Sequence, residues 1–134
     1  MPHLVILYTR NLDDEANISG LCRSLADTMV NVLDESGRQV FPTGGVRVLA
    51  YPAAHSAVAD CQREYAFVYL NLRMGRGRSA AVKQKAGDAL ESCVRGHFGS
   101  LFDRRYLGVT LQIDEGQEVY DAKLSSIHPL FNRS

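Results

Sequence analysis

Short apolar runs next to turn-forming residues predict two strands in the first part of this chain. Residues 3–8, His-Leu-Val-Ile-Leu-Tyr, form a short apolar run rich in β-branched side chains, and the polar residues 9–11 that follow are typical of a turn. A second run of this kind covers residues 46–51, directly after the turn-forming sequence Pro-Thr-Gly-Gly at 42–45. Both runs are therefore expected to be strands.

Between these strands, apolar residues recur at the three- and four-residue spacing of one helix face. They are Ile18, Leu21, Cys22, Leu25, Met29, Val32 and Leu33. Three acidic residues at 13–15 precede them, where the positive end of a helix dipole favours negative charge. Gly37 follows them and is typical of the end of a helix. The pattern predicts an amphipathic helix of about five turns.

The second half of the chain repeats the order of strand, helix and strand. Residues 65–74 alternate strictly, which places Ala66, Val68, Leu70, Leu72 and Met74 on one face and Phe67, Tyr69, Asn71 and Arg73 on the other. The strand pattern stops at Gly75-Arg76-Gly77-Arg78-Ser79, where Ser79 stands at a helix N-cap position. Apolar spacing from Val82 to Phe98 predicts a second helix closed by Gly99, and residues 107–113 alternate again as a fourth strand.

Two βαβ halves, about 1–60 and 61–134, predict a single domain over residues 1–134 with an α/β (α+β) fold. Right-handed crossovers place both helices on one face of a four-stranded sheet. The other face carries Phe67, Tyr69, Thr110 and Gln112, a mixture that indicates a subunit interface. The apolar tail at 127–131 is expected to dock either on a neighbouring chain or on its own domain.

Overall charge and cysteine content exclude several classes of protein. Fifteen basic and fifteen acidic residues give a net charge of zero, which argues against a nucleic-acid or membrane-surface protein. No apolar run approaches the roughly 18 residues of a membrane span. The three cysteines, an odd number without a C-x-x-C pair, and the scattered histidines argue against a disulfide framework and a metal site, so a cytoplasmic protein is expected.

Local charge differs from this neutral average. Residues 65–87 contain no carboxylate, but they contain the basic residues Arg73, Arg76, Arg78, Lys83 and Lys85. A strand that leads through Gly-x-Gly into a helix N-terminus can bind an anion with backbone N–H groups and guanidinium side chains. The alternative is a solvated face, which is the interpretation favoured for Lys83 and Lys85. Residues 75–80 also match a dinucleotide fingerprint formally, but the strand that should carry an acidic residue about 20 positions later is replaced by helix.

Pro2 is a second local feature with chemical meaning. A proline in this position is usually only a permitted N-terminal residue, but removal of Met1 would leave its nitrogen as a secondary amine at the start of a buried strand. A free α-amino group has a pKa of about 7.7 to 8.0, and burial and nearby arginines would lower that pKa. Such an amine would act as a base near neutral pH.

These features together resemble the tautomerase superfamily, and within it the 5-carboxymethyl-2-hydroxymuconate isomerase family. The resemblance spans nearly the whole chain and is carried by Met-Pro-His at 1–3, Phe-Pro at 41–42 followed by Gly-Val-Arg at 45–47, Tyr-Ala-Phe-Val at 65–68, Gly-x-Gly-Arg-Ser at 75–79, and His-x-Leu-Phe at 128–131. Residues 67–98 alone look like one small 4-oxalocrotonate tautomerase subunit.

The resemblance implies homotrimers of βαβ repeats that use the N-terminal proline as general base, with no metal or cofactor. It makes Pro2 the base, and Arg47 and Arg78 the residues that bind substrate carboxylates. The implied substrate is a small tricarboxylate dienol from homoprotocatechuate (4-hydroxyphenylacetate) breakdown, an aromatic-compound catabolic pathway. Residues 48–52 are less polar than the family pattern, and residues 34–39 look like an insertion. Two alternatives therefore stay open: a tautomerase of another enol or keto acid, and a non-catalytic trimeric binding protein of the same fold.

Overall fold

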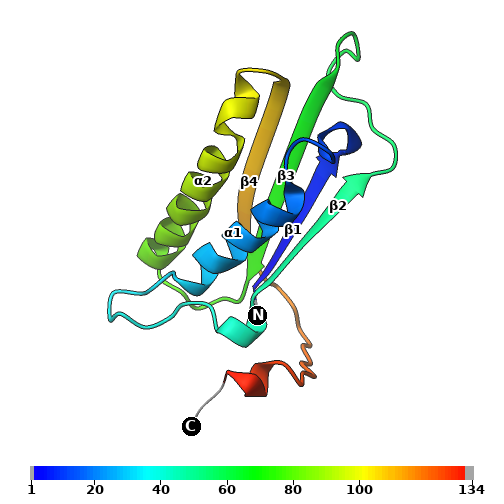
Figure 1. Ribbon diagram of the computed structural model, residues 1–134. Helices are drawn as coiled ribbons and strands as arrows, with labels where there is room; N and C mark the ends of the chain where they lie inside the picture. Colours follow the sequence, from blue (N-terminus) through cyan, green and yellow to red (C-terminus); the bar gives the residue numbers. More distant parts are fainter. Residues whose placement is uncertain (1, 132–134) are drawn as a thin grey trace.

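Two βαβ units lie side by side in one sheet (Figure 1). The structure is a computed structural model that describes residues 2–131. Its strands are β1 (His3–Thr9), β2 (Arg47–Ala53), β3 (Tyr65–Met74) and β4 (Tyr106–Glu115), and its helices are α1 (Ile18–Val30) and α2 (Ala80–Phe102). Short 3-10 helices cover Arg10–Leu12, Thr43–Gly45 and His128–Leu130. The sheet order is β2-β1-β3-β4, with β1 parallel to β2, β3 parallel to β4, and the two inner strands antiparallel.

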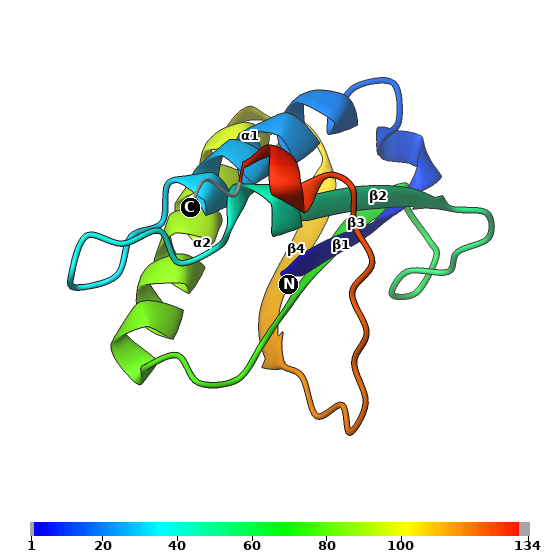
Figure 2. The same ribbon diagram turned by 90° about the horizontal axis from the view of Figure 1, so that it is seen from below.

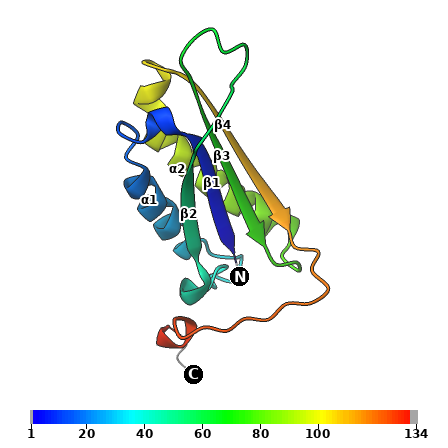
Figure 3. The same ribbon diagram turned by 90° about the vertical axis from the view of Figure 1, so that its right-hand side faces the viewer.

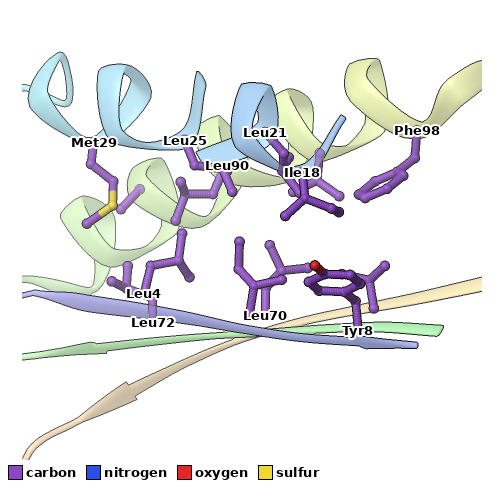
Figure 4. Close-up of a cluster of buried hydrophobic side chains, with 14 of the residues drawn as sticks. Leu4, Tyr8, Ile18, Leu21, Leu25, Met29, Leu70, Leu72, Leu90 and Phe98 are labelled. Atoms are coloured by element: carbon purple, nitrogen blue, oxygen red, sulfur yellow. The ribbon is translucent and has the colours of Figure 1, made fainter. Parts of the chain in front are cut away.

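Both helices pack on the same face of the sheet, as Figure 3 shows, and this confirms the predicted fold class. The strict alternation of β3 explains the packing, because Ala66, Val68, Leu70, Leu72 and Met74 are all buried. Figure 4 shows strand side chains such as Leu4 and Leu70 pointing toward Leu21, Leu25 and Leu90 of the helices. These side chains belong to one continuous apolar core between the sheet and the two helices.

Helix α1 is shorter than its sequence pattern predicts. It begins at Ile18 because the side chain of Asn17 accepts a hydrogen bond from the backbone N–H of Gly20 at 3.2 Å, and it ends at Val30. The acidic residues 13–15 lie outside the helix, where Asp13 accepts a hydrogen bond from the Tyr8 hydroxyl at 2.5 Å. Leu33 also lies outside and forms an antiparallel bridge with Gln39. Expecting five turns was therefore wrong, since Val32 and Leu33 continue the apolar spacing beyond the C-terminal end of the helix.

Helix α2 has the expected start and an unexpected end. The Ser79 hydroxyl accepts a hydrogen bond from the backbone N–H of Val82 at 3.2 Å, which confirms Ser79 as the N-cap. Gly99 does not close the helix, which continues to Phe102. The reason is packing, because Leu101 in the last turn is still buried against the core. Tertiary burial therefore outweighs the helix-weakening effect of glycine.

The tail lies against the 3-10 helix at Thr43–Gly45 through His128 (Figure 2). A Cβ atom added to Gly44 would lie 2.6 Å from the His128 Cα, so only glycine permits this approach. The apolar side chains of Ile127, Leu130 and Phe131 nevertheless remain exposed. Over residues 2–131, no helix is long and apolar enough to cross a membrane.

Candidate active site

The three residues predicted to form a site all lie at one end of the sheet. Strands β1 and β2 both begin at this end (Figure 3), and the antiparallel strand β3 ends there. Pro2 is buried and directly precedes β1, Arg47 is the first residue of β2, and Arg78 follows β3. The strand directions therefore bring together residues that lie far apart in the sequence.

A pocket of about 390 Å³ opens at this end of the sheet. One wall comes from the strands and the turn after β3, and the other comes from the segment that follows β4. The lining residues are His3, Arg47, Arg73, Met74 and Gly75 on the first wall, and Glu118, Asp121, Ala122, Lys123 and Leu124 on the second. Pro2 immediately precedes the first lining residue, His3. The pocket is therefore rich in charge, with cationic side chains on both walls.

His3 is exposed and lies at the centre of the first wall. It pairs in register with Arg47 on β2 and with Arg73 on β3. Partial burial and the neighbouring Arg47 guanidinium lower the pKa of His3. The shift favours the neutral form of the imidazole.

Arg47 is half-buried at the pocket wall. Its Nη1 donates a hydrogen bond to the Gly45 carbonyl at 2.8 Å, which ties the guanidinium to the turn before β2. A guanidinium carries five N–H donors in a planar fork, and this bond orients the group at the pocket wall. This arrangement agrees with the predicted carboxylate-binding role of Arg47, which remains a prediction.

Arg78 does not line the pocket, although its neighbour Gly75 does. Its Nη1 donates to the Gly75 carbonyl at 3.2 Å, and its Nη2 donates to the Val40 carbonyl at 2.9 Å. Its guanidinium carbon also lies 5.4 Å from the centroid of the Phe41 ring. Arg78 therefore connects the turn after β3 to the segment before β2, a structural role that the sequence pattern did not indicate.

Two basic residues of the carboxylate-free interval meet carboxylates from elsewhere in the chain. Lys83 forms an ion pair with Glu115 at 3.0 Å, and Arg73 approaches Glu118 at 3.6 Å. Lys83 is half-buried and paired, so its interpretation as part of a solvated face was wrong. Glu115 is the last residue of β4 and Glu118 follows this strand, which lies beside β3 in the sheet, and no sequence signal indicates that pairing.

Metal-binding geometry is not present in the part of the chain that the structure describes. Residues 2–131 contain no group of three or more histidine, cysteine, aspartate or glutamate side chains that could hold a metal ion. Cys22, Cys61 and Cys93 are free thiols.

Comparisons with known proteins point to one family, and the matches cover nearly the whole chain. The family model described as 5-carboxymethyl-2-hydroxymuconate isomerase matches residues 2–131. The 5-carboxymethyl-2-hydroxymuconate Delta-isomerase of Escherichia coli is 30% identical over 131 residues, which are 98% of this chain and 99% of that protein. A crystal structure of a 5-carboxymethyl-2-hydroxymuconate delta-isomerase is 52% identical, with a TM-score of 0.95 over 100% of this chain and 95% of that one. A 5-carboxymethyl-2-hydroxymuconate isomerase from Deinococcus radiodurans R1 is 34% identical, with a TM-score of 0.86 over 98% and 95% of the two chains.

Proposed function

Since this chain belongs to the 5-carboxymethyl-2-hydroxymuconate isomerase family and is an isomerase, we propose that it moves a proton within 5-carboxymethyl-2-hydroxymuconate with Pro2 as the general base. The observation that carries the proposal is the position of Pro2, which is buried immediately before His3 at a pocket lined by Arg47. A carboxylate-rich dienol needs both a base and cations, and this end of the sheet supplies both.

The proposed reaction begins at the substrate hydroxyl group. The Pro2 nitrogen, once Met1 has been removed, takes the enol proton, and the O–H electron pair forms the carbon–oxygen double bond of a ketone. The electrons of the diene shift along the chain, and the proton returns from Pro2 to the far carbon of the diene. One carbon–carbon double bond remains, conjugated with the new ketone. One O–H bond is broken and one C–H bond is formed, so no oxidant or reductant is consumed.

The surroundings of Pro2 support a base that works near neutral pH. Burial disfavours the charged ammonium form of an amine, and a guanidinium nearby disfavours it further. Both causes already lower the pKa of His3, the next residue along the chain. The same causes are expected to lower the pKa of a free Pro2 amine below its ordinary value of about 7.7 to 8.0.

Arg47 and Arg78 complete the proposal as carboxylate-binding residues. Arg47 lines the pocket, where its guanidinium can hold a substrate carboxylate and stabilise the negative charge that develops on the dienolate. Arg78 does not line the pocket, but its bond to the carbonyl of Gly75 ties it to the wall, and in the proposal its remaining N–H donors reach a second carboxylate of the substrate. The proposal requires no metal or cofactor.

We also propose that the chain assembles as a homotrimer in the cytoplasm and acts in homoprotocatechuate breakdown. The sheet face away from the helices exposes Gln112 and leaves Phe67 and Tyr69 only half-buried, which favours burial against another subunit. Free cysteines agree with a reducing compartment. Light scattering should give three times the mass of one chain, and a monomeric mass would contradict this part of the proposal.

The test compares the native chain, two altered chains and one control variant by the ultraviolet absorbance of the dienol. The native chain, shown by intact mass to lack Met1, should convert the substrate. The Pro2→Ala variant should lose nearly all conversion, and so should a chain with one glycine inserted between Met1 and Pro2, which keeps the proline but turns its nitrogen into an amide. Pro52→Ala, at an exposed position on β2, is the control and should keep full activity. Full activity of the glycine-insertion chain would overturn the mechanism, and a panel of smaller 2-hydroxydienoates and arylpyruvates would test the substrate.

A further inference from the structure

Arg73 and Arg47 stand on either side of His3 in the sheet. His3 pairs in register with both, so three neighbouring strands carry these side chains on one row. The row faces away from the helices, because the adjacent residues Leu4 and Leu72 point into the core. Neighbouring strands are about 4.8 Å apart, so the backbones of the two arginines are separated by about 10 Å. Two guanidinium groups at that separation can hold two different carboxylates of one elongated substrate.

Glu118 is the resident partner of Arg73. Its Oε2 lies 3.6 Å from the Arg73 Nη2, and the two side chains are 42% and 55% exposed. This separation exceeds that of a charge-assisted hydrogen bond, and an exposed pair is screened by water. An incoming carboxylate that forms a bidentate contact with the guanidinium would therefore replace a weak interaction with a stronger one.

Among residues 2–131, the segment that carries Glu118 is anchored to the rest of the domain at its two ends. At one end the backbone N–H of Gly116 donates to the Met74 carbonyl at 2.9 Å, which extends the pairing of β3 and β4. At the other end His128 packs against Gly44. Residues 117–124 between these anchors form neither helix nor strand and are exposed, so Glu118 can leave Arg73 without unfolding a packed element.

We propose that Arg73 binds a carboxylate of the substrate that neither Arg47 nor Arg78 holds, and that Glu118 occupies this position until the substrate displaces it. This inference rests on the proposed function. By its chemistry, 5-carboxymethyl-2-hydroxymuconate carries three carboxylates, and the carboxymethyl arm is the one that distinguishes it from 2-hydroxymuconate. Arg73 is thus assigned as a residue that determines specificity for the carboxymethyl arm, and Glu118 as an internal competitor for the same guanidinium.

The experiment measures KM and kcat for both compounds. The Arg73→Gln variant should raise KM for 5-carboxymethyl-2-hydroxymuconate about 10-fold, with little change in KM for 2-hydroxymuconate, because a lost charge-assisted contact of this kind corresponds to roughly one order of magnitude. Arg73→Lys should keep most of the preference because it retains the charge. The Glu118→Gln variant should lower KM for the tricarboxylate about 3-fold by removing the competitor.

Matched controls come from an exposed ion pair elsewhere in the chain. Arg23 and Asp27 pair at 2.8 Å on α1, with both side chains more than half exposed. Arg23→Gln and Asp27→Asn should leave the ratio of the two KM values unchanged. If Arg73→Gln also leaves that ratio unchanged while the native chain converts both compounds, the assignment of Arg73 is overturned and the proposed function stands. If the native chain converts neither compound, the proposed function itself fails.

Discussion

His3 lies directly opposite Arg47 in the parallel pair of β1 and β2, so the residue that follows Pro2 stands beside the first arginine of the pocket. The two positions are far apart in the sequence, and the register of the sheet alone brings them together. Because Arg47 is the first residue of its strand, its side chain lies at the end of the sheet where the pocket opens. This pairing is the structural basis for expecting a base and a carboxylate-binding group to act on one substrate.

Replacing Arg47 by glutamine should lower kcat/KM on the order of 100-fold, because a preorganised donor to the developing enolate charge is lost. Protein stability should change little, since the side chain is only half-buried. Steady-state kinetics measures the first effect and urea unfolding the second. Arg63→Gln is the control, because Arg63 lies at the other end of β3 and donates to the Tyr106 hydroxyl at 2.9 Å. Equal kinetics for the Arg47 and Arg63 variants would contradict the assigned role.

Replacing Arg78 by alanine should reduce both stability and catalysis. Its two hydrogen bonds to main-chain carbonyls and its contact with Phe41 are lost together, which should lower the free energy of unfolding by about 1 to 3 kcal/mol. Arg78→Lys retains the charge but cannot reach both carbonyls in the same planar geometry. It should therefore recover part of the activity and little of the stability, as measured by urea unfolding. If Arg78→Ala has the same free energy of unfolding as the native chain, these contacts do not hold the turn.

The sequence predicts the elements of this fold well because each strand is either a short apolar run or a clean alternation of apolar and polar residues. Residues 65–74 were expected as a strand from their alternation alone, and β3 has these same bounds. Helix ends were less predictable. Leu33 continues the apolar spacing of α1 but lies in a bridge beyond it, and Gly99 is a typical end residue inside a helix that packing prolongs. Local spacing thus identifies an element, and tertiary contacts decide where it ends.

The candidate site is only partly accessible to sequence reasoning. Pro2, Arg47 and Arg78 came from motifs, and the structure brings all three to one end of the sheet. The position of His3 between two arginines depends on strand register, and the approach of Glu118 to Arg73 depends on the path of an irregular segment. Neither feature has a periodic signature in the sequence. The alternation of β3 did place Arg73 on the face away from the core, which is the one local signal for its role.

A methyl group added at Gly44 should displace the tail from the domain. The new Cβ would lie 2.6 Å from the backbone of His128, a clash that no side-chain rotation can relieve. Gly44→Ala should therefore increase amide hydrogen exchange over residues 125–131, while exchange in the β1–β3 pair stays slow. The segment that forms the second wall of the pocket ends at this contact, so KM should rise as well. Unchanged exchange in the tail would show that His128 does not anchor it.

Replacing Gly99 by alanine should stabilise the protein. Gly99 lies inside α2, and a Cβ built there meets no atom within 4 Å. Alanine is favoured over glycine in a helix interior by roughly 0.5 to 1 kcal/mol, so Gly99→Ala should raise the free energy of unfolding by about that amount without changing activity. Urea unfolding at neutral pH measures the change. A loss of stability would indicate that the helix ends at Gly99 after all.

Replacing Tyr8 by phenylalanine should make the protein more resistant to alkali. Burial, and then the hydrogen bond that Tyr8 donates to Asp13, raise the pKa of Tyr8 from 10 to about 12. Above about pH 10 the unfolded chain loses this proton while the folded chain keeps it, so folding loses stability as the pH rises through this window. Tyr8→Phe should be about 1 kcal/mol less stable at neutral pH, through the lost hydrogen bond, but should lose less stability than the native chain between about pH 9 and about pH 11.5.

Tyr120→Phe, at a side chain that is 85% exposed, is the control for losing a tyrosine hydroxyl. Urea unfolding across this pH range measures the difference, and equal alkaline losses in the native chain and Tyr8→Phe would contradict a raised pKa for Tyr8.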